Sequence, residues 1–201
     1  MPSPTSTLTG ARLTAAALAL CAAGTAVAEP ERYEIDPDHF SIGFSIEHVG
    51  YADVLGMFLE GEGSFVYDEA ARELSEGRVE IAADSVFTNH EERDGHVRGD
   101  DFLAVEDHPE IVFVAREYRP DGEDGGQLEG DLTLHGETHP VTLDVTINKS
   151  AEYPFGHGQH TLGVSASTRI ERSRWGIDYG VANGMVGDTV ELDFEFEAIR
   201  Q

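Results

Sequence analysis

Hydrophobic and polar residues alternate along most of the chain after about the first thirty positions. Residues 41–48 place Ile42, Phe44, Ile46 and His48 on one face of an extended segment, with small or acidic residues on the other. Residues 189–198 repeat the pattern with acidic residues on the polar face. Each run predicts a strand with one apolar face. Shorter runs of the same period occur at residues 79–83, 111–115, 132–134, 141–147 and 162–170.

Three other segments complete the predicted organisation. Residues 53–67 predict one long strand, which glycines allow to bend or bulge. Residues 90–105 predict a short or broken helix, with Asn89 as its cap and glycines inside it. Residues 121–126 predict a loop, and residues 135–138 a tight hairpin connection.

Together these segments predict one all-β domain of about eight antiparallel strands with one short helical excursion. Strands that are apolar on one side must either pack as two facing sheets or close into a barrel. A sandwich fills its interior with side chains, whereas a barrel of about eight strands can keep an internal apolar cavity. Periodicity alone leaves both architectures open.

The amino-terminal segment, residues 1–28, predicts a cleaved secretory signal. Arg12 supplies positive charge, residues 13–23 are apolar, and Ala26-Val27-Ala28 fits a cleavage site. A transmembrane anchor would need about 20 apolar residues, more than the apolar stretch of residues 13–23 contains. A lipoprotein signal would need a small residue before Cys21, where Leu20 stands. We therefore expect a mature domain of residues 29–201.

Charge and residue types exclude several classes of function. The chain has 13 Lys+Arg against 39 Asp+Glu, so it lacks the cationic surface that binding of nucleic acid or an anionic membrane requires. The dispersed acids favour adaptation to salt over an acidic docking face. No nucleophile or phosphate-loop motif is present, so we expect no enzyme. The pairs His157/His160 and His135/His139 lack a third ligand, so we expect no metal site.

Four ordered groups of residues resemble the YceI-like family, secreted bacterial polyisoprenoid-binding proteins with a lipocalin-like barrel. The resemblance extends over residues 33–198, essentially the whole expected mature chain. Its most specific stretch is residues 85–113. The groups include Tyr33-Glu34-Ile35-Asp36, Arg93-Asp94-x-His96-Val97-Arg98, Gly130-Asp131-Leu132-Thr133-Leu134-x-Gly136 and Arg172-Ser173-x-Trp175-Gly176.

The resemblance implies a binder or carrier of an isoprenoid quinone or polyprenyl lipid, held in the barrel interior with no other cofactor required. His48, Arg93 and Arg98 are candidates for contacting a polar head group. Alternatively, His48 is structural and the arginines, like Arg172, pair with acids such as Asp94 and Asp101. The apolar lining is expected from inward positions that could equally be ordinary core: Phe44, Ile46, Phe58, Phe65, Ile81, Phe102, Phe113, Leu132 and Leu134.

The resemblance also implies export to the periplasm without stable membrane insertion. Two other functions stay open. One is binding of a different amphiphile, such as a fatty acid or amide. The other is an accessory role in which an acidic face docks with a membrane redox protein. A homodimer is compatible with the sequence, which does not show which strand edges are exposed.

Overall fold

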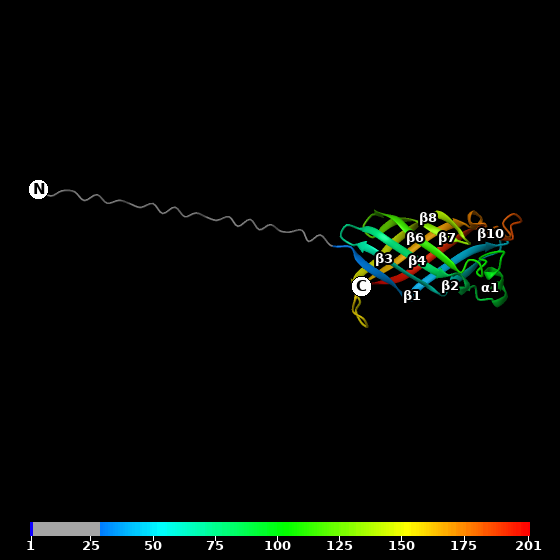
Figure 1. Cartoon of the computed structure of the whole chain (residues 1–201), viewed down its shortest axis with the longest axis horizontal. Helices are drawn as coiled ribbons and strands as arrows, with labels where there is room; N and C mark the ends of the chain where they lie inside the picture. Colours follow the sequence, from blue (N-terminus) through cyan, green and yellow to red (C-terminus); the bar gives the residue numbers. More distant parts are fainter. Residues whose placement is uncertain (2–28) are drawn as a thin grey trace.

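The computed structural model describes residues 29–201 together with Met1; the predicted signal segment otherwise lies outside the described residues. The described part of the chain folds into strands with one α-helix and two short 3-10 helices (Figure 1). In chain order these are β1 (Glu31–His48), β2 (Ala52–Phe58), β3 (Gly61–Asp68), β4 (Glu73–Ala82), η1 (Ala83–Ser85), β5 (Val86–Phe87), α1 (Glu91–Arg98), β6 (Glu110–Asp121), β7 (Gly125–Leu134), β8 (Glu137–Glu152), β9 (His160–Glu171), η2 (Arg172–Trp175) and β10 (Val186–Arg200).

The sheet closes on itself because β1 pairs with β10, with Tyr33 opposite Arg200 at one end and His48 opposite Val186 at the other. Strands β2 and β3 both pair with β1, at its second and first halves respectively, so they share one position in the wall. The result is a closed antiparallel barrel with eight wall positions. This confirms the all-β prediction and decides for the barrel over the sandwich.

The segment expected as one strand over residues 53–67 is two strands. The ladder breaks at Leu59 and Glu60, whose backbone N–H groups donate to Ser85 Oγ at 3.1 and 3.2 Å. The glycines do more than permit bending. At Gly56 a Cβ atom would lie 2.2 Å from the Phe44 ring, so glycine leaves room for that inward-facing ring.

The helix is shorter than residues 90–105 and begins one residue later than its predicted cap implies. His90, not Asn89, is the N-cap, and its Nδ1 accepts from Arg93 N at 3.4 Å. The helix ends at Arg98 because Gly99 returns to an extended conformation, and turns follow. The predicted hairpin at residues 135–138 is confirmed, whereas the loop at 121–126 is narrower, since β6 and β7 extend into it.

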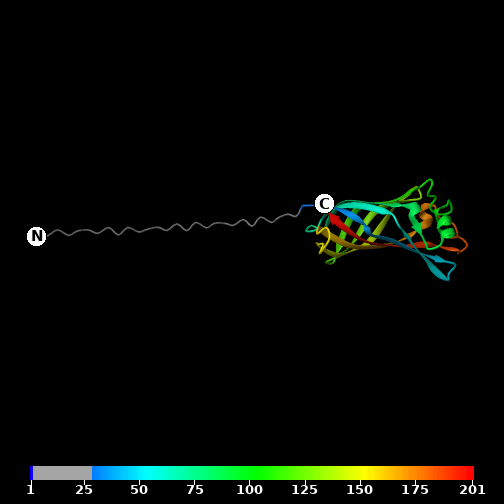
Figure 2. The same ribbon diagram turned by 90° about the horizontal axis from the view of Figure 1, so that it is seen from below.

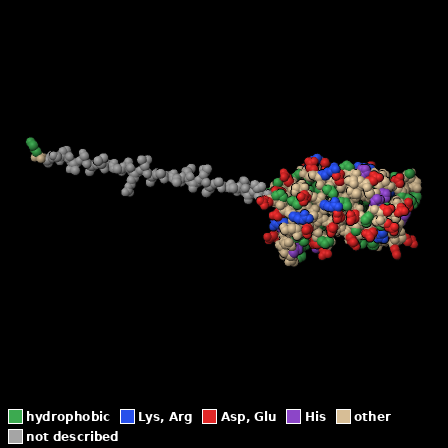
Figure 3. All heavy atoms as spheres, in the orientation of Figure 1, with side chains coloured by type: hydrophobic (Ala, Val, Ile, Leu, Met, Phe, Trp, Pro, Cys, Tyr) green, Lys and Arg blue, Asp and Glu red, His purple; other side chains and the backbone are tan. Residues whose placement is uncertain are grey.

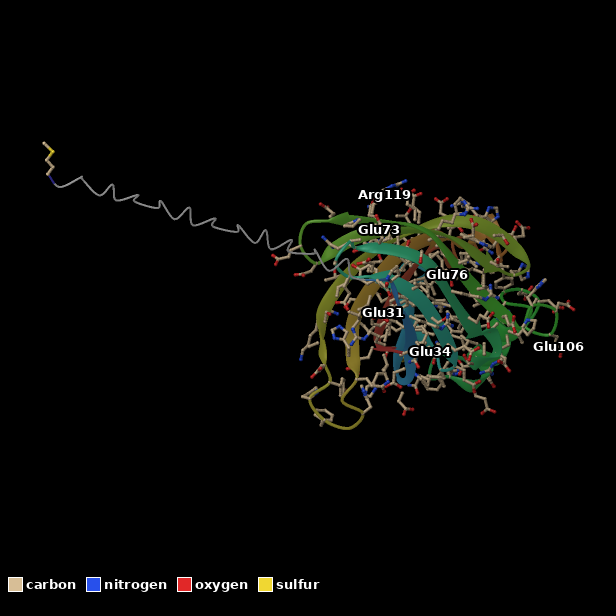
Figure 4. All side chains as sticks on the ribbon, turned by 60° about the vertical axis from the view of Figure 1, so that its left-hand side comes forward. Glu31, Glu34, Glu73, Glu76, Glu106 and Arg119 are labelled. Carbon is tan, nitrogen blue, oxygen red and sulfur yellow. The ribbon has the colours of Figure 1, made fainter. Side chains whose placement is uncertain are left out.

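Alternation decides which side chains face the interior. Apolar residues of β9 and β10 point inward, while the acidic residues of β10 and the small or hydroxyl residues of β9 between them point outward. Acidic side chains are spread over the face seen in Figure 3. The exposed glutamates of β1 and β4 labelled in Figure 4 likewise point away from the interior.

The two ends of the barrel are built differently. We call one the helix end; it consists of the β1–β2 turn, α1 and the segment 176–185, and the β1–β2 hairpin extends beyond the wall there (Figure 2). Val49 N donates to Met185 O at 3.1 Å and ties the turn to that segment. The other is the tyrosine end, named for Tyr33, Tyr67 and Tyr118; the carboxyl terminus lies beside it (Figure 1).

Candidate ligand cavity

An elongated cavity of about 620 Å³ runs inside the barrel. This volume lies within the range of sites for one small molecule. Its wall consists mainly of the inward aliphatic and aromatic side chains of the strands. A lining of this kind provides an apolar environment with few hydrogen-bonding groups, which suits a hydrocarbon chain.

The structure places every apolar residue of the predicted lining on this wall. Most are buried or partly buried in the larger core cluster, which occupies the half of the barrel near the helix end. Contact between any of them and a ligand stays a prediction. The residues are Phe44, Ile46, Phe58, Phe65, Ile81, Phe102, Phe113, Leu132 and Leu134.

The cavity reaches the surface at the helix end. Of the exposed residues that line it, all but Arg78 come from the β1–β2 hairpin, the residues in and just before α1, or the segment 176–185. A ligand tail inside the barrel would therefore have its polar head at this rim. The rim residues are Glu47, His48, His90, Glu92, Arg93, His96, Tyr179 and Met185.

His48 and Arg93 lie on this rim, whereas Arg98 does not line the cavity. His48 is exposed at the end of β1. Arg93 donates to Thr88 Oγ1 at 2.7 Å and to Thr88 O at 2.6 Å. Arg98 donates to the backbone carbonyls of Asp84 and Val86 at 2.7 and 2.8 Å. Arg98 thus holds the segment before α1, outside the cavity lining.

Among the described residues, Arg93 and Arg98 form no direct ion pair with Asp94 or Asp101, although the charges of both arginines act on Asp94. Asp94 is buried and accepts from Thr88 N at 2.7 Å and from the Thr88 hydroxyl. These hydrogen bonds, the side-chain one foremost, hold the pKa of Asp94 below its usual value. Asp101 pairs with His96 at 3.1 Å. The Asp94 carboxylate is thus bound by Thr88 and that of Asp101 by His96, while the guanidinium groups bind the Thr88 hydroxyl and backbone carbonyls.

Arg172 also departs from the expected acid pairing. It is 3% exposed and donates to four backbone carbonyls, those of Ile177, Tyr179, Val186 and Gly187, at 2.8–3.2 Å. Burial lowers its pKa, because water no longer solvates the charge. Its guanidinium lies 5.6 Å from the centre of the Phe102 ring. Arg172 therefore shapes the segment 176–185 that forms one side of the rim.

The tyrosine end is packed and hydrogen-bonded. Tyr33 is fully buried, stacks on Phe65 with ring centres 5.3 Å apart, and donates to Glu69 Oε1 at 2.6 Å. Tyr67 and Tyr118 pack edge to face at 6.2 Å. Burial followed by the contact with Glu69 raises the pKa of Tyr33, so its hydroxyl stays protonated. This end offers no comparable polar rim.

One group at the tyrosine end has the residue types of a hydrolase triad but not its geometry. His160 Nε2 lies 2.9 Å from Ser150 Oγ and 2.9 Å from Glu69 Oε1. In a catalytic triad the two imidazole nitrogens contact the serine and the acid separately. Here one nitrogen meets both, and the serine hydroxyl itself donates to Glu69. This arrangement fits a structural hydrogen-bond network.

The members of the two histidine pairs, His135/His139 and His157/His160, each contact different partners. His135 Nδ1 lies 3.0 Å from Trp175 O, and His139 pairs with Glu137 at 3.2 Å. His157 Nδ1 accepts from Gln159 N, and His160 belongs to the network above.

Sequence reasoning missed the rim residues Glu47, His90, Glu92, His96, Tyr179 and Met185. All but Glu47, which lies on the polar face of β1, are outside the alternating strands, so no periodic signal marks them. The available signal was resemblance: Arg93 to Arg98 and Arg172 to Gly176 carry family motifs, and these motifs flank the rim.

Comparison with known proteins agrees with this architecture. A family model for the YceI-like domain matches residues 33–198. The UPF0312 protein of Pseudomonas savastanoi pv. phaseolicola is 35% identical over 183 residues, which cover 91% of this chain and 93% of the relative. The UPF0312 protein of Pseudomonas fluorescens is 34% identical over the same coverage.

Solved structures show the same fold. The Campylobacter jejuni YCEI protein has a TM-score of 0.70 at 26% identity, covering 77% of this chain and 90% of that one. Burkholderia cenocepacia BcnA has a TM-score of 0.73 at 19% identity, covering 81% and 98%. A polyisoprenoid binding domain from Saccharophagus degradans has a TM-score of 0.62 at 16% identity, covering 84% and 98%. The last two likenesses show the fold alone.

No helix within the described residues is long and apolar enough to span a membrane.

Proposed function

The chain belongs to the YceI-like family, and from this premise we propose that it binds a long-chain isoprenoid lipid inside its barrel. The ligand is a ubiquinone-like or polyprenyl molecule, with its tail in the cavity and its head at the helix end. The protein acts in the periplasm as a carrier and carries out no chemistry on the ligand. The name of the Saccharophagus neighbour supports the same class of ligand.

One observation carries this proposal: the cavity is apolar along the barrel, and its exposed polar lining is concentrated at one end. Each buried CH₂ of a ligand gains roughly 0.8 kcal/mol before the costs of ordering are subtracted. A long hydrocarbon tail with one polar head matches this distribution of side chains. The predicted signal segment supports the periplasmic location.

The direct test fills the cavity. Ala166 is 8% exposed and lines the cavity from β9, so Ala166→Phe places a ring in the path of the tail. Ser167, its neighbour, does not line the cavity, which makes Ser167→Phe the matched control. Protein made with its complete sequence is analysed by native mass spectrometry, and its ligand is identified after solvent extraction.

We expect the wild type and Ser167→Phe to carry a discrete isoprenoid mass, and Ala166→Phe to lose most of it while keeping its unfolding transition. Protein that is empty and takes up neither a quinone nor a prenyl phosphate would contradict the proposal. An extracted fatty acid or amide would keep the binding function and replace the ligand, since such an amphiphile fits the same apolar cavity.

A further inference from the structure

A bulge in β1 creates a feature outside the barrel that the binding function does not use. Ile35 pairs with Ala198 and Phe40 with Phe196, so four residues of β1 stand opposite the single residue Glu197 of β10. Bulges commonly redirect side chains at functional positions. This one turns Asp36 and His39 towards Glu197 on the outer surface.

The three side chains converge on one point. His39 Nδ1 lies 2.7 Å from Asp36 Oδ2 and 3.8 Å from Glu197 Oε2. One ligand atom from each residue lies within 4.8 Å of the other two. Asp36 and Glu197 are only partly exposed, at 18% and 32% of their side chains, whereas His39 is 53% exposed. The group is thus held by the wall and open to solvent on one side.

These distances suit a small divalent ion. Zinc bonds to imidazole nitrogen and carboxylate oxygen at about 2.0–2.2 Å, which places tetrahedral ligands about 3.3 Å from one another. The two separations measured from His39 Nδ1 lie on either side of that value. One nitrogen and two carboxylates leave a fourth position for water, and an imidazole donor favours a first-row transition metal over Mg²⁺ or Ca²⁺.

Neighbouring groups hold the ligands in place. Asp38 N donates to Asp36 Oδ1 at 3.1 Å, which leaves Oδ2 directed at His39. Tyr153, the first residue of the β8–β9 loop, donates its hydroxyl to Glu197 Oε1 at 3.5 Å.

We propose that Asp36, His39 and Glu197 form a binding site for one first-row divalent metal ion, on the outside of the barrel and separate from the lipid cavity. The ion would lie between the three side chains and fasten the β1 bulge to β10. This site needs no lipid, so it stands or falls independently of the proposed function.

The probe is Zn²⁺, titrated by calorimetry into metal-stripped protein made with its complete sequence, in high salt with excess Mg²⁺. Magnesium and salt saturate the scattered carboxylates of this acidic surface. The variants are His39→Asn and Glu197→Gln, and the control is His139→Asn. His139 pairs with a single carboxylate, Glu137, at 3.2 Å, so it has an imidazole and an acid but no third ligand.

We expect one Zn²⁺ per chain in the wild type and in His139→Asn. Loss of an outer partner of a metal ligand costs about 10–100-fold in affinity, so loss of His39 or Glu197 should cost at least about tenfold. Zn²⁺ should also raise the unfolding temperature of the wild type and leave that of His39→Asn unchanged. Equal unfolding temperatures of the metal-free proteins would show that the variants fold.

Three results would overturn the site. They are absence of saturable binding in excess Mg²⁺, unchanged affinity in His39→Asn, and equal losses in His39→Asn and His139→Asn. The last would show that any histidine beside an acid on this surface binds zinc as well.

Discussion

The two ends of the barrel use aromatic and charged residues in opposite ways. At the tyrosine end, Tyr33 is fully buried and its hydroxyl is satisfied by Glu69. At the helix end, Tyr179 is 37% exposed and packs at 5.2–5.3 Å against His96 and Phe102 on the cavity rim. A polar group with a protein partner closes an end, whereas exposed polar groups around an opening can receive a ligand.

This difference gives the proposed ligand a direction. The tail would point towards the tyrosine end, where the smaller core cluster of Tyr33, Tyr67, Leu162, Val164 and Ala198 is almost fully buried. The head would stay at the helix end, where α1 and the segment 176–185 are joined to the barrel by turns. Truncation of the buried Tyr33 ring should therefore cost more stability than truncation of a partly buried ring at the rim, and ligand affinity should depend more on the helix end.

The largest effect should come from Tyr33→Ala. It removes a fully buried ring, its stack on Phe65 and its hydrogen bond to Glu69, so we expect a loss of about 3–5 kcal/mol in the free energy of unfolding. Denaturant unfolding measures this loss. Tyr33→Phe keeps the ring and should lose only about 1.5–3 kcal/mol, the contribution of a hydrogen bond to a charged group.

The counterpart at the helix end is Phe102→Ala, which we expect to cost less than Tyr33→Ala because the Phe102 ring is only partly buried. Equal losses at the two positions would remove the energetic distinction between the ends.

A smaller effect is expected on the free energy of unfolding at acidic pH, and carboxyl groups at both ends of the barrel contribute to it. Burial tends to raise the pKa of Glu69, but hydrogen bonds from Ser150 and Tyr33 and the nearby His160 outweigh burial and hold it below the ordinary value of 4.5. A carboxyl whose folded pKa is lowered adds stability that is complete above its unfolded pKa. That stability is lost as the pH falls through the folded value.

Glu69→Gln should therefore flatten the dependence of unfolding free energy on pH below about 4.5, with little change in slope near neutrality. Asp94→Asn should flatten it at the helix end, beginning at lower pH because the ordinary value for Asp is 3.8. Urea midpoints across this range measure both slopes. An unchanged slope in Glu69→Gln would show that the tyrosine-end network adds no acid-sensitive stability.

The strands could be predicted from the sequence because a barrel wall has an apolar and a polar side, which produces a period of two. Closure could not, since a sandwich has the same period and only the pairing of β1 with β10 separates them. The apolar lining followed from the strands, except for Phe102, which lies in the turns after α1. The arginine contacts did not, because backbone carbonyls in turns leave no mark on the sequence. Likewise, only the bulge brings Asp36 and His39 to Glu197.

The smallest effect concerns His48, whose role with a head group stays a prediction. His48 is exposed on the rim, so its contribution should be that of one hydrogen bond, about 0.5–1.5 kcal/mol. His48→Asn should then weaken binding of a short-chain ubiquinone by roughly 2–10-fold, as measured in a titration with native mass spectrometry as the readout. His157→Asn is the control, because His157 is exposed in the β8–β9 loop and stacks on Tyr153 outside the cavity. Equal affinities in the two variants would indicate that the head group binds near Arg93 and α1 instead of near His48. They would not change the inferred direction of the tail.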